Sequence, residues 1–218
     1  MSRFDWIFFD LDGTLTDPGE GITNSIRYAM ERAGMTPWPR EALYRFVGPP
    51  LLTEFQAAFG VDAAAADGLL RDFRVYFTRQ GIFENQMYDG IPALLALLRA
   101  AGRSLGVATS KPEAFAVQIL EHFGIAGYFD VVAGSGLDER TRATKRDVLA
   151  RALTLAGEPD RSRAVLAGDR RHDVEGAQAL GVYSLGVLYG YGSRAELTEA
   201  GADLLAETVP AVGEVLLA

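Results

Sequence analysis

The sequence contains no cysteine, only two lysines beside nineteen arginines, and no apolar run long enough to cross a bilayer. Without cysteine the chain has no disulfide bond, no thiolate metal site and no cysteine nucleophile, a composition that fits a reducing compartment. Basic residues form no cluster, and the net charge of -8 disfavours a nucleic-acid partner, because such partners bind basic faces. The acidic motif that begins at Asp10 leaves no room for a signal peptide before it. We therefore expect a cytoplasmic protein that binds neither membranes nor nucleic acid.

Short apolar runs recur along the 218 residues, and each is followed by a longer stretch with helical spacing. The runs cover residues 4–9, 104–108, 129–133, 163–167 and 182–188. This alternation predicts an α/β fold built on a parallel sheet.

The pattern changes between the first two runs. Amphipathic segments of helical length occupy residues 20–33, 40–46, 50–59 and 63–80, and glycine and proline separate them. The region contains no convincing strand. This region predicts an all-helical insertion after the first strand. We expect a core domain of residues 1–16 and 85–218 and a helical domain of residues 17–84.

Carboxylates and hydroxyls gather where the predicted strands end, which is the edge of an open parallel sheet where sites form. They are Asp10 and Asp12 after the first strand, Thr109 and Ser110 after the second, and Asp169 after the fourth, with Asp173 one helical turn further on. Two charged carboxylates about 4 Å apart repel by a few kcal/mol, so a cation is expected between them. Oxygen ligands without cysteine or a histidine pair indicate Mg²⁺ rather than zinc. The alternative is that these aspartates only cap turns and helix starts.

Lys145 is the third candidate element. Thr144 and Asp147 have the spacing of a capping box, which places Lys145 in the first turn of a helix, where the helix dipole disfavours a cation. A phosphate bound at the same helix start would favour that charge. The alternative is an ordinary solvated lysine, but the two lysines of the chain, Lys111 and Lys145, both follow strand ends.

Four segments occur in the order of the four motifs of the haloacid dehalogenase-like hydrolase superfamily, which the sequence resembles over nearly its whole length. They are DLDGT (10–14), VATSKP (107–112), Lys145 and GDRRHD (168–173). The resemblance implies a Rossmann-like parallel sheet with helices on both faces, and the insertion is similar to the superfamily's helical cap domain. The segments GEGITNSIRYAM, FVGPPL and FENQMYDGI are similar to the phosphoglycolate phosphatase-like branch.

The resemblance implies that Asp10 attacks phosphorus to form an aspartyl-phosphate, and that Asp12 protonates the leaving oxygen and then activates water. The implied activity is a magnesium-dependent phosphatase acting on a small phosphorylated metabolite, a phosphomonoester like phosphoglycolate. Two alternatives stay open: a phosphomutase of the same superfamily, although such enzymes usually have Val where Thr14 stands, and a non-catalytic phospho-acceptor or binding domain.

The resemblance also assigns binding roles. Thr109, Ser110 and Lys145 would hold the phosphoryl oxygens. The Mg²⁺ ligands would be the Asp10 carboxylate, the Asp12 backbone carbonyl and Asp169, with Asp173 nearby or bound through water. In the helical insertion the candidate substrate contacts are Glu20, Arg27 and Arg45, for which a solvated position on a helix is the alternative. We expect a monomer or a homodimer.

Overall fold

The computed structural model of the chain describes residues 3–218 and divides into two compact units. We call Met1–Thr16 with Met87–Ala218 the sheet unit and Asp17–Gln86 the helical unit. In chain order the elements are β1 (Trp6–Phe9), β2 (Thr16–Asp17), α1 (Gly19–Arg32), α2 (Arg40–Leu43), η1 (Tyr44–Phe46), α3 (Leu51–Phe59), α4 (Ala63–Tyr76), η2 (Phe77–Gly81), β3 (Gln86–Met87), α5 (Ile91–Ala100), β4 (Ser104–Pro112), α6 (Glu113–His122), η3 (Ala126–Tyr128), β5 (Val131–Ser135), α7 (Lys145–Leu155), η4 (Arg161–Arg163), β6 (Ala164–Gly168), α8 (Arg171–Gln178), β7 (Tyr183–Val187), α9 (Arg194–Glu199), β8 (Leu204–Ala206) and α10 (Val209–Leu217).

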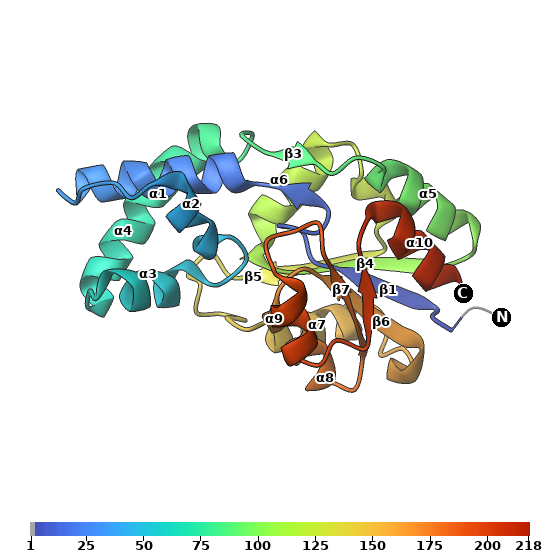
Figure 1. Ribbon diagram of the computed structural model, residues 1–218. Coiled ribbons are helices and arrows are strands. Elements are labelled where there is room, and N and C mark those ends of the chain that lie inside the picture. The colour runs from blue at the N-terminus through green and yellow to red at the C-terminus, as the bar shows by residue number, and fades with distance from the viewer. Residues whose placement is uncertain (1–2) are drawn as a thin grey trace. The chain divides into compact units, whose positions relative to one another are not determined.

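The sheet unit is built on a six-stranded sheet in the order β5-β4-β1-β6-β7-β8, and every strand pair is parallel. Helices α5, α6 and α10 cover one face, and α7 and α8 cover the other (Figure 1). The five apolar runs all form strands, so the predicted α/β fold is confirmed. Strand β8 was not predicted, because its three residues lie in a short apolar stretch without the length of the other runs.

Strand β1 lies in the middle of the sheet, and its side chains are buried on both faces. Phe8 packs in a core with Leu166 of β6 and Leu149 of α7. Successive side chains of a strand point to opposite faces, so Phe9 faces the other layer, where its ring lies 6.5 Å from that of Phe129. The helices on both faces therefore explain why this strand is continuously apolar rather than alternating.

The topology brings the ends of three strands together. Strand β1 ends at Phe9 between β4 and β6, and the Asp10 backbone N–H still donates to Ala167 O at 2.8 Å. The polar residues that follow these three strands are thus held at one edge of a buried sheet. The pairing of β4 with β5 shifts register between Thr109 and Pro112, which bends the end of β4 out of the regular ladder.

The helical unit contains the predicted insertion, and its helices lie close to the predicted ranges. Helix α1 packs on α4, and the two rings of α3, Phe55 and Phe59, form a second cluster with Phe46. The long helix expected over 63–80 ends as an α-helix at Tyr76 and continues as the π-helical turn η2. Across residues 3–218, none of the helices combines the length and the apolar character needed to cross a membrane.

The sheet core yields a stability prediction. Leu166 of β6 is fully buried in the core that also contains Phe8 and Leu149, so Leu166→Ala leaves a cavity and lowers the free energy of unfolding by about 2–5 kcal/mol. Leu97 is 51% exposed on α5, and Leu97→Ala costs less than about 1 kcal/mol. Urea denaturation of both variants measures the difference, and equal losses would contradict the placement of the core.

Candidate active site

Lys145 lies at the centre of the acidic edge. Its Nζ is 2.7 Å from Asp10 Oδ1, 2.8 Å from Asp173 Oδ1 and 3.2 Å from the backbone oxygen of Ala108. All three side chains of the ion pairs are only 3% exposed. An ammonium has three N–H donors, so these contacts engage each of them. In this arrangement Lys145 links the two carboxylates and offsets their repulsion.

Two local features place Lys145 there. The predicted capping box is confirmed: Thr144 Oγ1 accepts from the Asp147 N–H at 3.2 Å, and the Asp147 carboxylate accepts from the Thr144 N–H at 3.3 Å. Helix α7 therefore begins at Lys145. Gly176 of α8 leaves space for the side chain to pass, because a Cβ there would lie 2.9 Å from Lys145 Cγ. Although burial alone lowers the pKa of Lys145, Asp10 and Asp173 raise it above its usual value.

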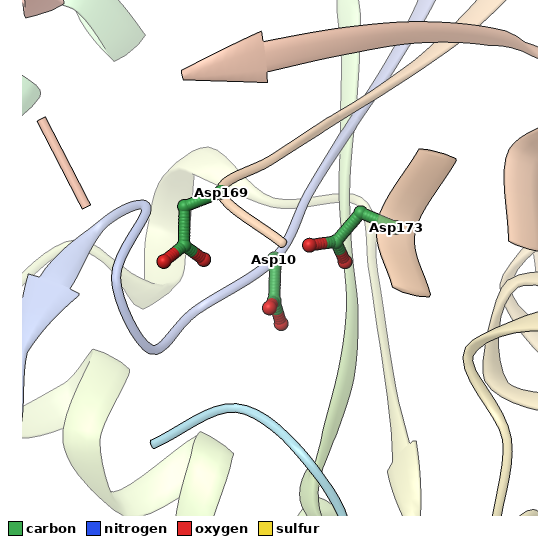
Figure 2. Close-up of side chains that lie close together, drawn as sticks. All are labelled: Asp10, Asp169 and Asp173. Atoms are coloured by element: carbon green, nitrogen blue, oxygen red, sulfur yellow. The ribbon is translucent and has the colours of Figure 1, made fainter. Parts of the chain in front are cut away.

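Asp10, Asp169 and Asp173 converge from three elements. Asp10 follows β1, Asp169 follows β6 and Asp173 lies in the first turn of α8. Figure 2 shows their carboxylates turned toward a common space. One oxygen of each lies within 4.8 Å of the others. Burial raises the pKa of Asp169 well above its usual value, and the charges of Asp173 and Asp10 raise it further. Burial also raises the pKa of Asp173, to about 6, against the opposing charge of Lys145.

These residues fit a divalent metal ion. Asp169 Oδ1 is buried and has no hydrogen-bond partner within residues 3–218. The donor set consists of carboxylate oxygens without nitrogen or sulfur, which suits a hard cation. If all are ionised, the four buried carboxylates of the site and its two buried lysines leave an excess of two negative charges, the charge that such an ion balances.

A loop after β7, residues 189–192, fixes the other oxygen of Asp169. The Tyr191 backbone N–H donates to Asp169 Oδ2 at 2.7 Å, and the Tyr189 hydroxyl donates to the backbone oxygen of Thr14 at 3.0 Å. Gly190 allows this close approach, because a Cβ there would lie 2.4 Å from Asp169 Cβ. The contact through Tyr191 could not be predicted because it uses a backbone donor, which no side-chain pattern reveals.

A second unpredicted contact supports the start of α8. Glu196 Oε1 accepts from Arg170 Nε at 2.9 Å and from the Arg171 backbone N–H at 3.0 Å. The Arg170 N–H in turn donates to Asp173 Oδ2 at 3.0 Å. Arg170 and Arg171 thus connect Glu196 to the helix start that orients Asp173.

The phosphate-binding candidates lie beside these aspartates. Thr109 is buried at the end of β4, and its Oγ1 accepts from the Lys111 N–H at 3.2 Å, so the hydroxyl proton can be donated elsewhere. Ser110 is half-buried. Lys111, to which the sequence assigned no role, lies with its Nζ 2.6 Å from Asp12 Oδ2. Burial raises the pKa of Asp12, and Lys111 opposes that shift.

The three candidate substrate contacts all lie in the helical unit and are exposed. Arg27 lines a cavity of about 250 Å³ with Tyr28 and Tyr76, and Glu20 lines one of about 210 Å³ near Asn85. Arg45 pairs with Glu54 at 3.3 Å. Their contact with substrate stays a prediction.

Comparison with known proteins identifies the family. The model of the family described as haloacid dehalogenase-like hydrolase matches residues 7–187, so the chain belongs to that family and the predicted resemblance is confirmed. Its relatives include proteins described as a 5'-nucleotidase and as phosphoglycolate phosphatases, and a similar solved structure is described as a predicted phosphatase. The chain is therefore an enzyme of the phosphatase class within the family.

Individual relatives carry several names. A 5'-nucleotidase of Pseudomonas aeruginosa is 43% identical over 89% of this chain and 87% of its own length. The tyrosine-protein kinase PtkA of Mycobacterium tuberculosis is also 43% identical, but the chain spans only 62% of that protein. A phosphoglycolate phosphatase of Rhodospirillum rubrum is 32% identical over 96% of this chain and 90% of its own. A crystal structure of a predicted phosphatase from Clostridium acetobutylicum has 43% identity, a TM-score of 0.94 and 98% coverage of both chains.

The convergence of carboxylates predicts a metal-dependent stability that Asp169 controls. Mg²⁺ in excess raises the melting temperature of the parent protein, because a ligand that binds only the folded state stabilises it. Asp169→Asn removes that increase. In EDTA the same variant is more stable than the parent by on the order of 1 kcal/mol, because one of the converging buried charges is gone. Asp89→Asn, at an exposed position, is the control, and an equal Mg²⁺ effect in parent and Asp169→Asn would contradict the site.

The loop over Asp169 generates a second prediction. A Cβ at Gly190 would lie 2.3 Å from Gly13 O and 2.6 Å from Asp169 Oδ2, so Gly190→Ala displaces the Asp169 carboxylate. We expect Mg²⁺ affinity, measured by calorimetric titration, to fall by about 10-fold to 100-fold. Gly127→Ala is the matched control, since a Cβ there meets nothing within 4 Å. Unchanged affinity in Gly190→Ala would show that the loop does not position Asp169.

Proposed function

We propose that the protein is a magnesium-dependent phosphatase that hydrolyses a small phosphomonoester through an aspartyl-phosphate on Asp10. The observation that carries this proposal is the position of the Asp10 carboxylate, which shares a buried space with Asp169 and Asp173 and is paired with Lys145. Family membership supports the reaction class. Asp10, Asp169 and Asp173 would hold Mg²⁺, with the backbone carbonyl of Asp12 as a further ligand.

The chemistry needs one nucleophile and one proton donor. A carboxylate oxygen of Asp10 attacks phosphorus while the bond from phosphorus to the leaving oxygen breaks, and the Asp12 carboxyl group gives that oxygen a proton. Water then attacks the phosphorus of the aspartyl-phosphate, and Asp12 takes a proton from it. The net reaction converts ester and water into alcohol and phosphate, with both carboxyl groups restored.

The remaining residues position the phosphoryl group. The Thr109 hydroxyl donates to one of its oxygens, and Ser110 lies on the same loop. Bound Mg²⁺ would supply positive charge to the phosphoryl oxygens, where charge gathers during transfer. Lys145 holds Asp10 in place, and it can reach a phosphoryl oxygen by exchanging one of its three contacts.

Substrate selection belongs to the helical unit, which we propose is a cap domain with its boundaries near residues 17 and 84. Two kinds of relative are 43% identical, and the chain covers 87% of the 5'-nucleotidase but only 62% of PtkA, whereas the phosphoglycolate phosphatases reach 29–32% identity. We therefore place nucleoside 5'-monophosphates first among the candidate substrates and phosphoglycolate second. Glu20, Arg27 and Arg45 are the proposed contacts for the leaving group.

Replacement of the nucleophile tests the reaction. Asp10→Asn keeps the shape of the side chain but removes the attacking oxygen charge, so turnover of p-nitrophenyl phosphate with Mg²⁺ falls by at least about 1000-fold. The exposed Asp89→Asn retains parent activity. Phosphate release is measured with Mg²⁺ and with EDTA. Activity of Asp10→Asn equal to the parent would overturn the proposal, and a folded parent without activity at any metal concentration would favour a binding role.

A panel of phosphorylated metabolites at fixed Mg²⁺ ranks the substrates. We expect the highest kcat/KM for a nucleoside 5'-monophosphate, with phosphoglycolate and sugar phosphates in the same series. A higher value for phosphoglycolate would restore it to first place. Transfer of the phosphoryl group to a sugar phosphate instead of water would establish the phosphomutase alternative.

A further inference from the structure

Lys111 has a buried ion pair to which the proposed reaction gives no role. Its Nζ lies 2.6 Å from Asp12 Oδ2, and the two side chains are 6% and 8% exposed. A buried ion pair contributes little net stability, because removal of both charges from water offsets their attraction. Stability alone therefore does not explain why a lysine is placed here, next to the residue that exchanges protons with the substrate.

The backbone around Lys111 is arranged to deliver this ammonium. The register shift at the end of β4 takes Lys111 out of the regular ladder, and its N–H donates to Thr109 Oγ1. The chain crosses directly over Gly134 of β5, where a Cβ would lie 2.6 Å from Lys111 O. Glu113 Oε2 accepts from the Gly134 N–H at 3.2 Å and ties the crossing to β5. The backbone that carries the Lys111 side chain is thus held by Thr109 on one side and by β5 on the other.

The two oxygens of Asp12 are in different environments. Oδ2 is held by Lys111, whereas Oδ1 is buried without a hydrogen-bond partner in the part of the chain that the structure describes. Asp169 shows the same division, with Oδ2 bound by the Tyr191 N–H and Oδ1 unpaired. In both residues one oxygen is used to orient the carboxyl group, and none of residues 3–218 supplies a hydrogen-bond partner for the other.

We propose that Lys111 is the positioning residue of Asp12: its ammonium holds Oδ2 so that Oδ1 is the oxygen that exchanges a proton with the leaving group. This inference rests on the proposed phosphatase reaction. As the bond between phosphorus and the leaving oxygen breaks, that oxygen takes the proton from Oδ1, and Oδ1 later takes a proton from the attacking water. Lys111 remains an ammonium throughout and acts only through Asp12.

Leaving groups of graded basicity test this role. A weakly basic phenolate departs without a proton, whereas an alkoxide needs one, so Lys111→Met should lower kcat/KM for alkyl phosphates by about tenfold more than for p-nitrophenyl phosphate. In Lys111→Met the slope of log kcat/KM against the pKa of the leaving group is therefore steeper than in the parent protein. Asp12→Asn, the positive control, steepens it as well. Arg99→Met, which removes an ion pair of 2.7 Å elsewhere in the sheet unit, leaves the slope unchanged.

Rescue keeps the test independent of folding. Because the chain has no cysteine, Lys111→Cys introduces a unique thiol, and alkylation with 2-bromoethylamine during refolding restores an ammonium near the original place. We expect the alkylated protein to recover the shallow slope of the parent and the unmodified variant to keep the steep one. A fall of kcat/KM by the same factor for every leaving group, or a rise in KM alone, would overturn the proposal in favour of phosphate binding or a structural role. An inactive parent would instead refute the phosphatase assignment itself.

Discussion

The structure depends on the concentration of negative charge at a buried edge of the sheet. Four aspartates lie within the site, all nearly inaccessible to water, and mutual repulsion would disperse them if nothing offset it. The two lysines of the chain are both placed among them, each within hydrogen-bond distance of a carboxylate. The apolar strand β1 makes this arrangement possible, because its burial fixes the point at which Asp10 emerges.

The loops around this edge serve the same constraint. Gly190 lets the β7 loop approach Asp169 closely enough for a backbone N–H to bind it, and Glu196 holds the arginines that begin α8. Each carboxylate is therefore oriented by a neighbour from another segment of the chain. Preorganised charge of this kind is what phosphoryl transfer requires, since the reaction is governed more by positioning and electrostatics than by covalent demands on the protein.

Much of this site could be predicted from the sequence, because local rules determined it. The apolar runs fixed the strand ends and hence the positions of Asp10 and Asp169, and the capping box at Thr144 fixed the start of the helix that carries Lys145. The contact of Lys111 with Asp12 could not be predicted, because it depends on a register shift against β5, a relation between distant segments. The Tyr191 contact uses the backbone, which every residue has. The substrate is harder still to predict from the sequence, since exposed side chains such as Arg27 carry no pattern that distinguishes a substrate contact from a solvated position.

The central claim is that a carboxylate oxygen of Asp10 becomes bonded to phosphorus during turnover. Rapid acid quenching of the Asp12→Asn variant mixed with substrate and Mg²⁺, followed by mass spectrometry of the peptides, tests it most directly. Loss of the residue that we propose activates water should let the intermediate accumulate. The account predicts the added mass of one phosphoryl group on the peptide that contains Asp10. Phosphate release without any such adduct, or an adduct on a different residue, would contradict it.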